Sequence, residues 1–447
     1  MTSLRTCIAC TIVIAGMVAV AAGCAPTSAQ TAVPSSTSSP GAVDAAGASG
    51  DGGALWDSST VHSISIDYDA DEYASMIEAY LADGDKEWIS ATVVIDGRRF
   101  EDVGLKLKGN SSLKGLSSEA DAELSSQVPQ DLPWIIRLDK FVDGQNLAGT
   151  TEIVARGNGS ATSLNEALAL ELLDEAGLAA EQAIAVRLSI AGSDESLRLV
   201  IENPDDDWAA RELGDGLLYK AEAGGDYSYR GKDASAYDEV FDQEAGEDDL
   251  TPLIDFLRWI NESDDEEFEA ELSEHLEVDA FATYLAFQEI VDNFDDIDGP
   301  GNNSYLSYDP DSGRMTVVTW DLNLAFGARP SGAGAGGGQR GAGASAGPER
   351  SQRLTGGQDA DAAGAVAAPG GAPGGESNVL AERFLATNAF RALYESEIDR
   401  LTATLIDSGV AAQALQDWTE VLTAQAADLV SAETISQESA ALAQQLG

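Results

Sequence analysis

The sequence predicts an α+β protein, and three observations support this class. Short segments that alternate apolar and polar residues dominate the first half of the folded region, as in half-buried strands. Longer segments with helical spacing dominate the second half. The chain has 447 residues, 44% of them hydrophobic, which is enough for one large domain or two ordinary ones with a buried core. Strands first and helices later are typical of α+β chains.

A secretory signal with a lipobox is predicted at residues 1–24. One positive charge precedes the uncharged apolar run 7–22, and small residues stand directly before Cys24. Cys24 would then become the lipidated N-terminus and hold the protein at the outer face of the cell membrane. An ordinary secretory signal cut nearby is the alternative. Residues 25–55 have almost no large apolar side chains, which predicts a disordered tether before a folded domain at 56–447.

The first half of this domain is predicted to be rich in strands. A strand at 61–66 precedes a helix at 71–81, and the runs 90–95 and 100–107 flank an Asp-Gly turn, which is typical of a β-hairpin. A helix is predicted at 163–176, where Ser163 and Glu166 have the spacing of a capping box. The other strand patterns in this half are 134–138, 184–190, 197–202 and 217–221.

The second half is predicted to be mainly helical. Helices are expected at 253–260 and 279–291. Residues 262–279 hold ten acidic residues without a Lys or Arg, a pattern that favours a solvated helix face over a cation-binding segment. A hairpin is expected at 304–308 and 315–320. Residues from about 329 to 377 are rich in Gly and Ala and are predicted to be a disordered insertion. Helical periodicity returns over 378–447.

Composition excludes several classes of function. The net charge of −52 disfavours nucleic acid as a partner, because binding it begins with neutralising phosphates. Two histidines are too few for a three-His metal site, and all three cysteines lie in the first 24 residues. Chemistry in the domain must therefore rely on carboxylates, amides, hydroxyls and a few cations.

Three segments could carry such chemistry. A strand ends in Lys-Gly-Asn-Ser-Ser at 108–112, where a lysine and hydroxyls could cradle an anion or simply form a polar turn. Residues 291–303 hold four aspartates and then two asparagines, which suits Mg²⁺ or Mn²⁺ but also a solvated loop. Asp321 follows an apolar strand, and the hairpin could return it near Asp295 and Asn303, as in phosphoryl-transfer sites. A strand that ends in a solvated Asp is the alternative.

The chain resembles the spore coat protein H (CotH) kinase family over roughly residues 60–440. Four segments carry the resemblance: DGRRFEDVGLKLKGNSS at 96–112, TSLNEALALELLDEAGL at 162–178, LLYKAEAG at 217–224 and NFDDIDGPGNNSYLSYDPDSGRMTVVTWDLNLAFG at 293–327. The resemblance implies a divergent (atypical) protein-kinase-like two-lobed fold, with a strand-rich N-terminal lobe and a helical C-terminal lobe.

The resemblance also implies roles for single residues. Asp295 would be the catalytic base, although Asp292, Asp296 and Asp298 remain alternatives because the stretch to Asn303 is long. Glu166 would pair with a phosphate-binding cation, unless it only completes the capping box. The residues implied to meet the nucleotide are Lys108, Asn110, Ser111 and Arg137, and those implied to hold the metal are Asp321 and Asn303. Asn323 stands where the family usually has a second Asp.

The function implied is an extracytoplasmic, lipid-anchored kinase that transfers phosphate from ATP, with Mg²⁺ or Mn²⁺, to Ser or Thr of an exported protein. No nucleic acid partner is expected. The alternative is a catalytically inactive CotH-like surface module for adhesion or envelope or coat assembly. A third possibility is storage of divalent cations by the acidic surface.

Overall fold

The computed structural model describes residues 55–109, 113, 128–222, 225–297, 299, 302–329 and 378–447, all within the unit that begins at residue 49. The signal peptide predicted at 1–24 lies outside the described residues. The same holds for nearly all of the tether predicted at 25–55 and of the insertion predicted at about 329–377.

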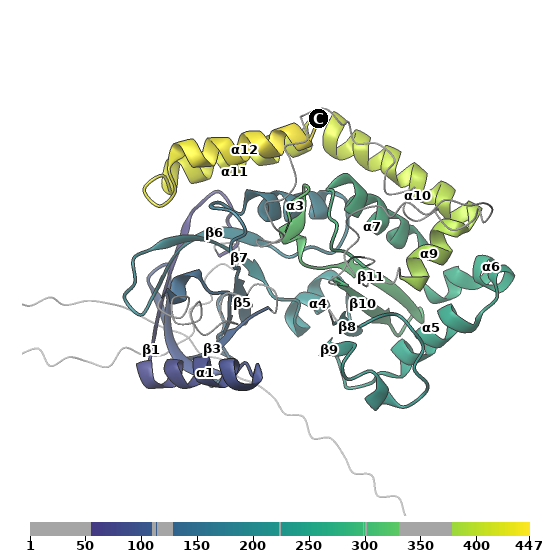
Figure 1. Ribbon diagram of the computed structural model, residues 1–447, viewed down its shortest axis with the longest axis horizontal. Coiled ribbons are helices and arrows are strands. Elements are labelled where there is room, and N and C mark those ends of the chain that lie inside the picture. Colours follow the sequence, from purple (N-terminus) through teal and green to yellow (C-terminus); the bar gives the residue numbers. More distant parts are fainter. Residues whose placement is uncertain are drawn as a thin grey trace, which may run out of the picture. The chain divides into compact units, whose positions relative to one another are not determined.

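Seven strands of the described chain close into a barrel in the order β1-β2-β3-β4-β5-β7-β6 (Figure 1). Neighbouring strands are antiparallel except β1 and β6, which pair in parallel and close the barrel. The pairing of β2 with β3 confirms the predicted hairpin. The strands are β1 (His62–Tyr68), β2 (Ile89–Ile95), β3 (Arg98–Leu107), β4 (Trp134–Arg137), β5 (Glu152–Ala155), β6 (Ala183–Ile190) and β7 (Ser196–Glu202).

A second sheet of four strands has the order β11-β10-β8-β9. It contains β8 (Leu217–Ala221), β9 (Phe241–Ala245), β10 (Ser304–Asp309) and β11 (Arg314–Thr319). The antiparallel pairing of β10 with β11 confirms the second predicted hairpin. The tight turn of this hairpin lies at Asp309–Arg314. The start of β10 and the end of β11, which Asp321 follows, therefore lie together at the other end of the hairpin.

The helices cover the strands and fill the second half of the described chain. They are α1 (Ala70–Asp83), α3 (Leu164–Glu175), α4 (Asp206–Glu212), α5 (Thr251–Glu262), α6 (Asp265–His275), α7 (Val278–Ile290), α9 (Val379–Ala386), α10 (Asn388–Leu401), α11 (Val410–Gln425) and α12 (Ala432–Gln445). The acidic run forms α6, which buries Phe268 and Leu272 and leaves most of its carboxylates exposed, as a solvated helix face does. The protein is therefore of mixed α and β structure, as predicted.

Alternate residues of the barrel strands belong to two different cores. On β5, Ile153 and Ala155 point into the barrel and pack with its apolar interior. Val154 points outward and joins the larger core that contains α3 and α7. Because side chains alternate along a strand, Glu152 and Arg156 share this outward side with Val154. The outer face of the barrel is thus covered, and it carries charged side chains.

Candidate functional site

Three charged residues from distant parts of the chain meet at the outer face of the barrel. Arg156 directly follows β5, Glu166 lies in the first turn of α3, and Asp321 lies two residues after the end of β11. Arg156 Nε lies 2.8 Å from Glu166 Oε1, and Arg156 Nη2 contacts Asp321 Oδ1. Arg156 and Glu166 are only 8% and 3% exposed, whereas the Asp321 side chain is 25% exposed. The cluster is therefore a buried ion pair with one carboxylate that reaches partly to solvent.

Burial and charge act in opposite directions on this cluster. Burial alone would lower the pKa of the Arg156 guanidinium, but the carboxylates of Asp321 and Glu166 outweigh it and raise that pKa. For Glu166, burial raises the carboxyl pKa, Arg156 opposes the rise, and the nearby charge of Asp321 adds to it. Two carboxylates on one arginine repel each other, so a further cation beside Asp321 would be favourable.

Backbone geometry holds Asp321 in an unusual position. Its φ of 59° lies in the left-handed region, which Asp tolerates better than most residues do. The following turn returns to the end of α7, where the backbone N–H of Gly327 donates to the carbonyl of Asp292 at 3.1 Å. Gly327 also has a positive φ of 69°, and a Cβ there would lie 2.9 Å from Asp292 Oδ2. The Trp-Asp-Leu segment and the Asp-rich loop are therefore fixed against each other.

Lys108 lies beside this cluster. Its Nζ donates to Asn203 Oδ1 at 2.5 Å and stands 4.9 Å from the ring centroid of Trp320, the residue before Asp321. Burial lowers the pKa of Lys108 to about 8, and Glu152 and Glu244 oppose the shift. The structure thus places the lysine of the Lys-Gly-Asn-Ser-Ser segment next to the strand end that carries Asp321. Asn110 and Ser111 of that segment lie outside the described residues.

Asn303 and Asp295 lie together in the Asp-rich loop. Asn303 Nδ2 donates to the backbone carbonyl of Asp295 at 3.0 Å, although eight residues separate them. Asn293 Nδ2 donates to Gln288 Oε1 at 2.9 Å and ties the start of the loop to α7. These hydrogen bonds place Asn303 against Asp295. The ion pair with Arg156 holds Asp321 separately. Asp298, one of the alternative bases, lies outside the described residues.

Two other predicted residues have clear positions. Arg137 on β4 lies 2.7 Å from Asp139 and 3.7 Å from Glu152, so its carboxylate partners differ from those of Arg156. Within the described residues, the Ser163 side chain makes no cap hydrogen bond at the start of α3, so the capping-box alternative for Glu166 is wrong. Glu166 pairs instead with a cation, as the resemblance implies. Cys24 lies outside the described residues.

Sequence reasoning missed Arg156 and also Glu181. Glu181 is 4% exposed, and burial raises its carboxyl pKa to about 8 in spite of a backbone hydrogen bond and the charge of Arg156. Neither residue lies in a segment that showed a motif. The signal that could have found Arg156 is its place at the end of an apolar run, eight residues before the helix that carries Glu166.

The side chains near Asp321 offer a metal ion few oxygen donors. Among the residues that the structure describes, no three His, Cys, Asp or Glu side chains group as a metal cage. Asn323 Oδ1, two residues after Asp321, is buried and has no hydrogen-bond partner within the described part of the chain. Mg²⁺ usually keeps waters and substrate phosphates around one or two carboxylates, so Asp321 with an amide oxygen fits it better than it fits a cage-bound ion.

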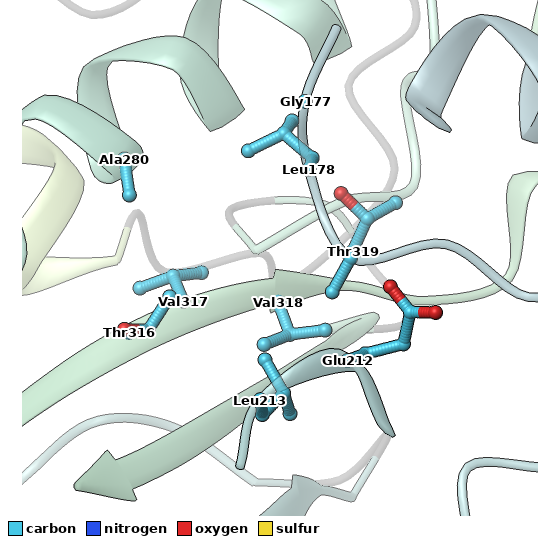
Figure 2. Close-up of a pocket in the computed structure, with 10 residues that line it drawn as sticks. Gly177, Leu178, Glu212, Leu213, Ala280, Thr316, Val317, Val318 and Thr319 are labelled. Carbon is cyan, nitrogen blue, oxygen red and sulfur yellow. The ribbon is translucent and has the colours of Figure 1, made fainter. Parts of the chain in front are cut away.

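Two cavities border the elements of this site. One of about 260 Å³ lies along β11 and is lined by Val317, Val318 and Thr319, together with Leu213 and Glu212 (Figure 2). None of Arg156, Glu166 and Asp321 lines it. The other, of about 380 Å³, includes Glu152 and Asn203 in its lining and so reaches the partner of Lys108.

The sequence model of the family described as CotH kinase protein matches residues 105–440, so the chain belongs to the CotH kinase protein family. The matched range contains β4, β5, α3, both hairpin strands of the second sheet, and all three members of the Arg156 cluster. No curated protein matches the chain. No helix in the described ranges is long and apolar enough to cross a membrane.

Proposed function

We propose that this chain is an atypical, metal-dependent protein kinase that transfers phosphate from ATP to Ser or Thr of exported proteins. The observation that carries the proposal is the buried Arg156–Glu166 ion pair beside Asp321. In protein kinases a strand lysine pairs with a helix glutamate and meets the nucleotide phosphates, and an aspartate after a strand binds the metal. Arg156, Glu166 and Asp321 come from the same kinds of element.

The proposed fold is the two-lobed kinase arrangement in divergent form. The strand-rich lobe would comprise the barrel with α3, and the helical lobe would comprise α5–α7 and α9–α12 with the second sheet. Strands β3, β4, β5 and β7 lie side by side in that order, and α3 connects β5 to β6. This order supports the proposal because α3 then brings Glu166 back to the strand end that carries Arg156.

Each residue then has a role in transfer. Arg156 and Lys108 would meet the phosphates, and Glu166 would hold the Arg156 guanidinium in place. Asp321 would offer Oδ2 to the metal, since Arg156 contacts Oδ1, and Asn303 and Asn323 would offer amide oxygens. A bound Mg²⁺ or Mn²⁺ supplies charge stabilisation of the transferring phosphoryl group.

Asp295 would orient the acceptor hydroxyl and take its proton. As the hydroxyl oxygen forms its bond to the γ-phosphorus, the bond from that phosphorus to the bridging oxygen breaks and ADP leaves. The hydrogen bond from Asn303 to the carbonyl of Asp295 would fix the loop that carries this base.

We also propose that the protein is tethered to the outer face of the cell membrane through lipidated Cys24, where its exported substrates pass. The apolar run before Cys24 supports this location. A Cys24→Ser variant of the full chain should leave the membrane fraction, whereas a variant that stays with the membrane would contradict the anchor.

The activity is tested by transfer of labelled γ-phosphate from ATP to casein or to the chain itself, with Mn²⁺ or Mg²⁺. Asp321→Ala should reduce transfer on the order of 10²- to 10³-fold, because charge stabilisation of the transition state is lost. Asp311→Ala, in the exposed turn between β10 and β11, is the matched control and should keep full transfer. Equal transfer by both variants, or none by the natural chain, would overturn the proposal.

One observation favours the second candidate, a catalytically inactive surface module. Asn323 takes the place of a second aspartate, so the metal would meet one carboxylate fewer beside Asp321. Titration calorimetry of the full chain with ATP and Mn²⁺ separates the two candidates. An inactive module of this kind should show no metal-dependent binding of nucleotide.

A further inference from the structure

The lysines of this chain are concentrated in one region. The sequence has only seven lysines against 77 Asp and Glu, and six of the seven are described. Five of these six form a continuous series in which each lies in the electrostatic field of another: Lys140, Lys106, Lys86, Lys220 and Lys108. The series comes from four strands or their flanking loops, so sequence proximity does not explain it.

The outer end of the series is a patch around Trp88, formed by Trp88, Lys106 and Lys140. Lys106 Nζ lies 4.6 Å and Lys140 Nζ 4.9 Å from the centroids of the Trp88 rings. Gly104 of β3 makes room for the Trp88 patch, because a Cβ at Gly104 would lie 2.5 Å from Lys140 Cβ and 2.9 Å from Trp88 Cε3. Two ammonium groups on one indole repel each other, although the ring attracts both.

The two ammonium groups of the Trp88 patch have no ion-pair partner within 4.0 Å among the described residues. This is notable in a chain where acids outnumber bases about three to one. By contrast, Arg137 on the neighbouring strand contacts two carboxylates. Ammonium groups that no carboxylate contacts are able to attract an anion that arrives from solvent.

The series leads inward from the Trp88 patch to the Arg156 cluster. Lys140 is exposed, Lys106, Lys86 and Lys220 are half-buried, and Lys108 stands over Trp320 beside Arg156. Glu152, Glu222, Glu244 and Asp242 lie along the same path, and Glu222 pairs with Lys220 at 2.6 Å, so the charge of the path is close to balanced. Elsewhere the protein is strongly negative, and this path therefore repels an approaching anion least.

We infer that the Trp88 patch is the surface through which an anionic nucleotide approaches the Arg156 cluster. This inference rests on the proposed function, since it takes the phosphate donor as the anion. A small anion fits this path better than an acidic peptide does, because the series of lysines ends at a buried arginine. Charged steering of this kind raises association rates by about 10- to 1,000-fold and falls with ionic strength.

The test measures the rate at which a fluorescent ATP analogue binds to the full chain with Mg²⁺, by stopped flow. The variant carries Lys106→Gln and Lys140→Gln, and Lys232→Gln, a lysine outside the series, controls for loss of charge alone. At low salt the double variant should associate about 3- to 10-fold more slowly, with dissociation changed less than about 2-fold. At high salt the difference should vanish, because the Debye length falls to about 3 Å at 1 M.

A second readout does not need the nucleotide. Iodide and neutral acrylamide quench tryptophan fluorescence, and comparison with Trp88→Phe isolates the signal of Trp88. Relative to free tryptophan, iodide should quench Trp88 more strongly than acrylamide does, and this excess should disappear in the double variant. An iodide-to-acrylamide ratio no higher than that of free tryptophan would show that the Trp88 patch attracts no anion and would overturn the inference.

The outcomes separate this inference from the function on which it rests. If the full chain binds no nucleotide, the proposed function fails and the nucleotide route fails with it, whatever iodide shows. If nucleotide binds at the same rate with and without the two lysines, only the inference is overturned. If the double variant instead loses affinity for an acidic peptide and keeps its nucleotide association rate, the Trp88 patch belongs to the acceptor and the inference is also overturned.

Discussion

The two faces of the same barrel strands differ in almost every physical respect. Inside the barrel, Val93, Leu105 and Ile136 are fully buried among apolar neighbours. On the outer side of β3 and β5 stand Lys106 and Glu152, with Lys108 and Arg156 at the strand ends. Because consecutive residues point to opposite faces, one strand supplies both stability and chemistry. A mutation that shifts the register by one residue would therefore lose both.

The largest effect that distinguishes the two faces is expected for Ile136→Ala, which leaves a cavity inside the barrel. The free energy of unfolding should fall by about 2–5 kcal/mol, because transfer and cavity costs add. Lys106→Ala on the outer face should change it by less than about 0.5 kcal/mol. Urea unfolding of both variants measures the difference. Equal losses of unfolding free energy would show that the inner and outer faces contribute alike to stability.

Breaking the ion pair on the outer face tests whether that face is also important for stability. Glu166→Ala removes one partner of a buried pair and leaves Arg156 with Asp321 alone, so the free energy of unfolding should fall by about 3 kcal/mol. Glu166→Gln keeps the volume and is expected to recover part of the loss, because the amide can still accept a hydrogen bond. If Glu166→Ala unfolds as the natural chain does, the pair contributes nothing to stability.

Much of this fold could be predicted from local patterns, but the site residue Arg156 could not. The two hairpins were predicted because alternation and turn residues are local signals. Strand β5 was missed because Glu-Ile-Val-Ala is short and buried on both faces, so it shows no alternation. Arg156 follows that strand and was missed with it. Asp321 was found because it follows an apolar strand and a hairpin, and the family resemblance also marks its segment and that of Glu166.

Closure of the barrel was also beyond local reasoning. β1 and β6 pair in parallel although more than a hundred residues separate them, and nothing in either segment specifies the other. The pairing of β3 with β2 and with β4 brings Lys106 and Lys140 to the ring of Trp88. The positions of the lysines in the sequence therefore do not show that they form this series.

The pH dependence of nucleotide binding tests the charge of Lys108 on the outer face of the barrel. Burial lowers the pKa of Lys108 from 10.5 to about 8, so its ammonium becomes neutral in the free protein as the pH rises through about 8. A bound anion favours the charged form, so binding near pH 8 should take up a proton and weaken above it. Calorimetry in buffers of different ionisation enthalpy measures this uptake, and Lys108→Gln should abolish it. Uptake that persists in Lys108→Gln would assign the proton to another group.

The lowered pKa of Lys108 also makes the free energy of unfolding depend on pH in a definite direction. Between pH 8 and 10.5 the unfolded chain holds the Lys108 proton and the folded chain does not. Stability contributed by this group therefore rises with pH across that window, and below pH 8 its full destabilising effect is present. Comparison of the natural chain with Lys108→Gln across the window isolates this term. A difference that does not change with pH would show that Lys108 titrates normally.

The smallest effect is expected at Ser163, and it tests whether Glu166 serves the helix or the site. A serine that caps a helix through its hydroxyl contributes about 1 kcal/mol to stability. Ser163 has a left-handed φ of 53° and makes no cap hydrogen bond among the described residues, so Ser163→Ala should change the free energy of unfolding by less than about 0.5 kcal/mol. A loss near 1 kcal/mol would restore the capping box and would give Glu166 a role in the helix as well. An unchanged stability, set against a large loss in Glu166→Ala, leaves the Arg156 pair as the reason that a carboxylate is buried in the first turn of α3.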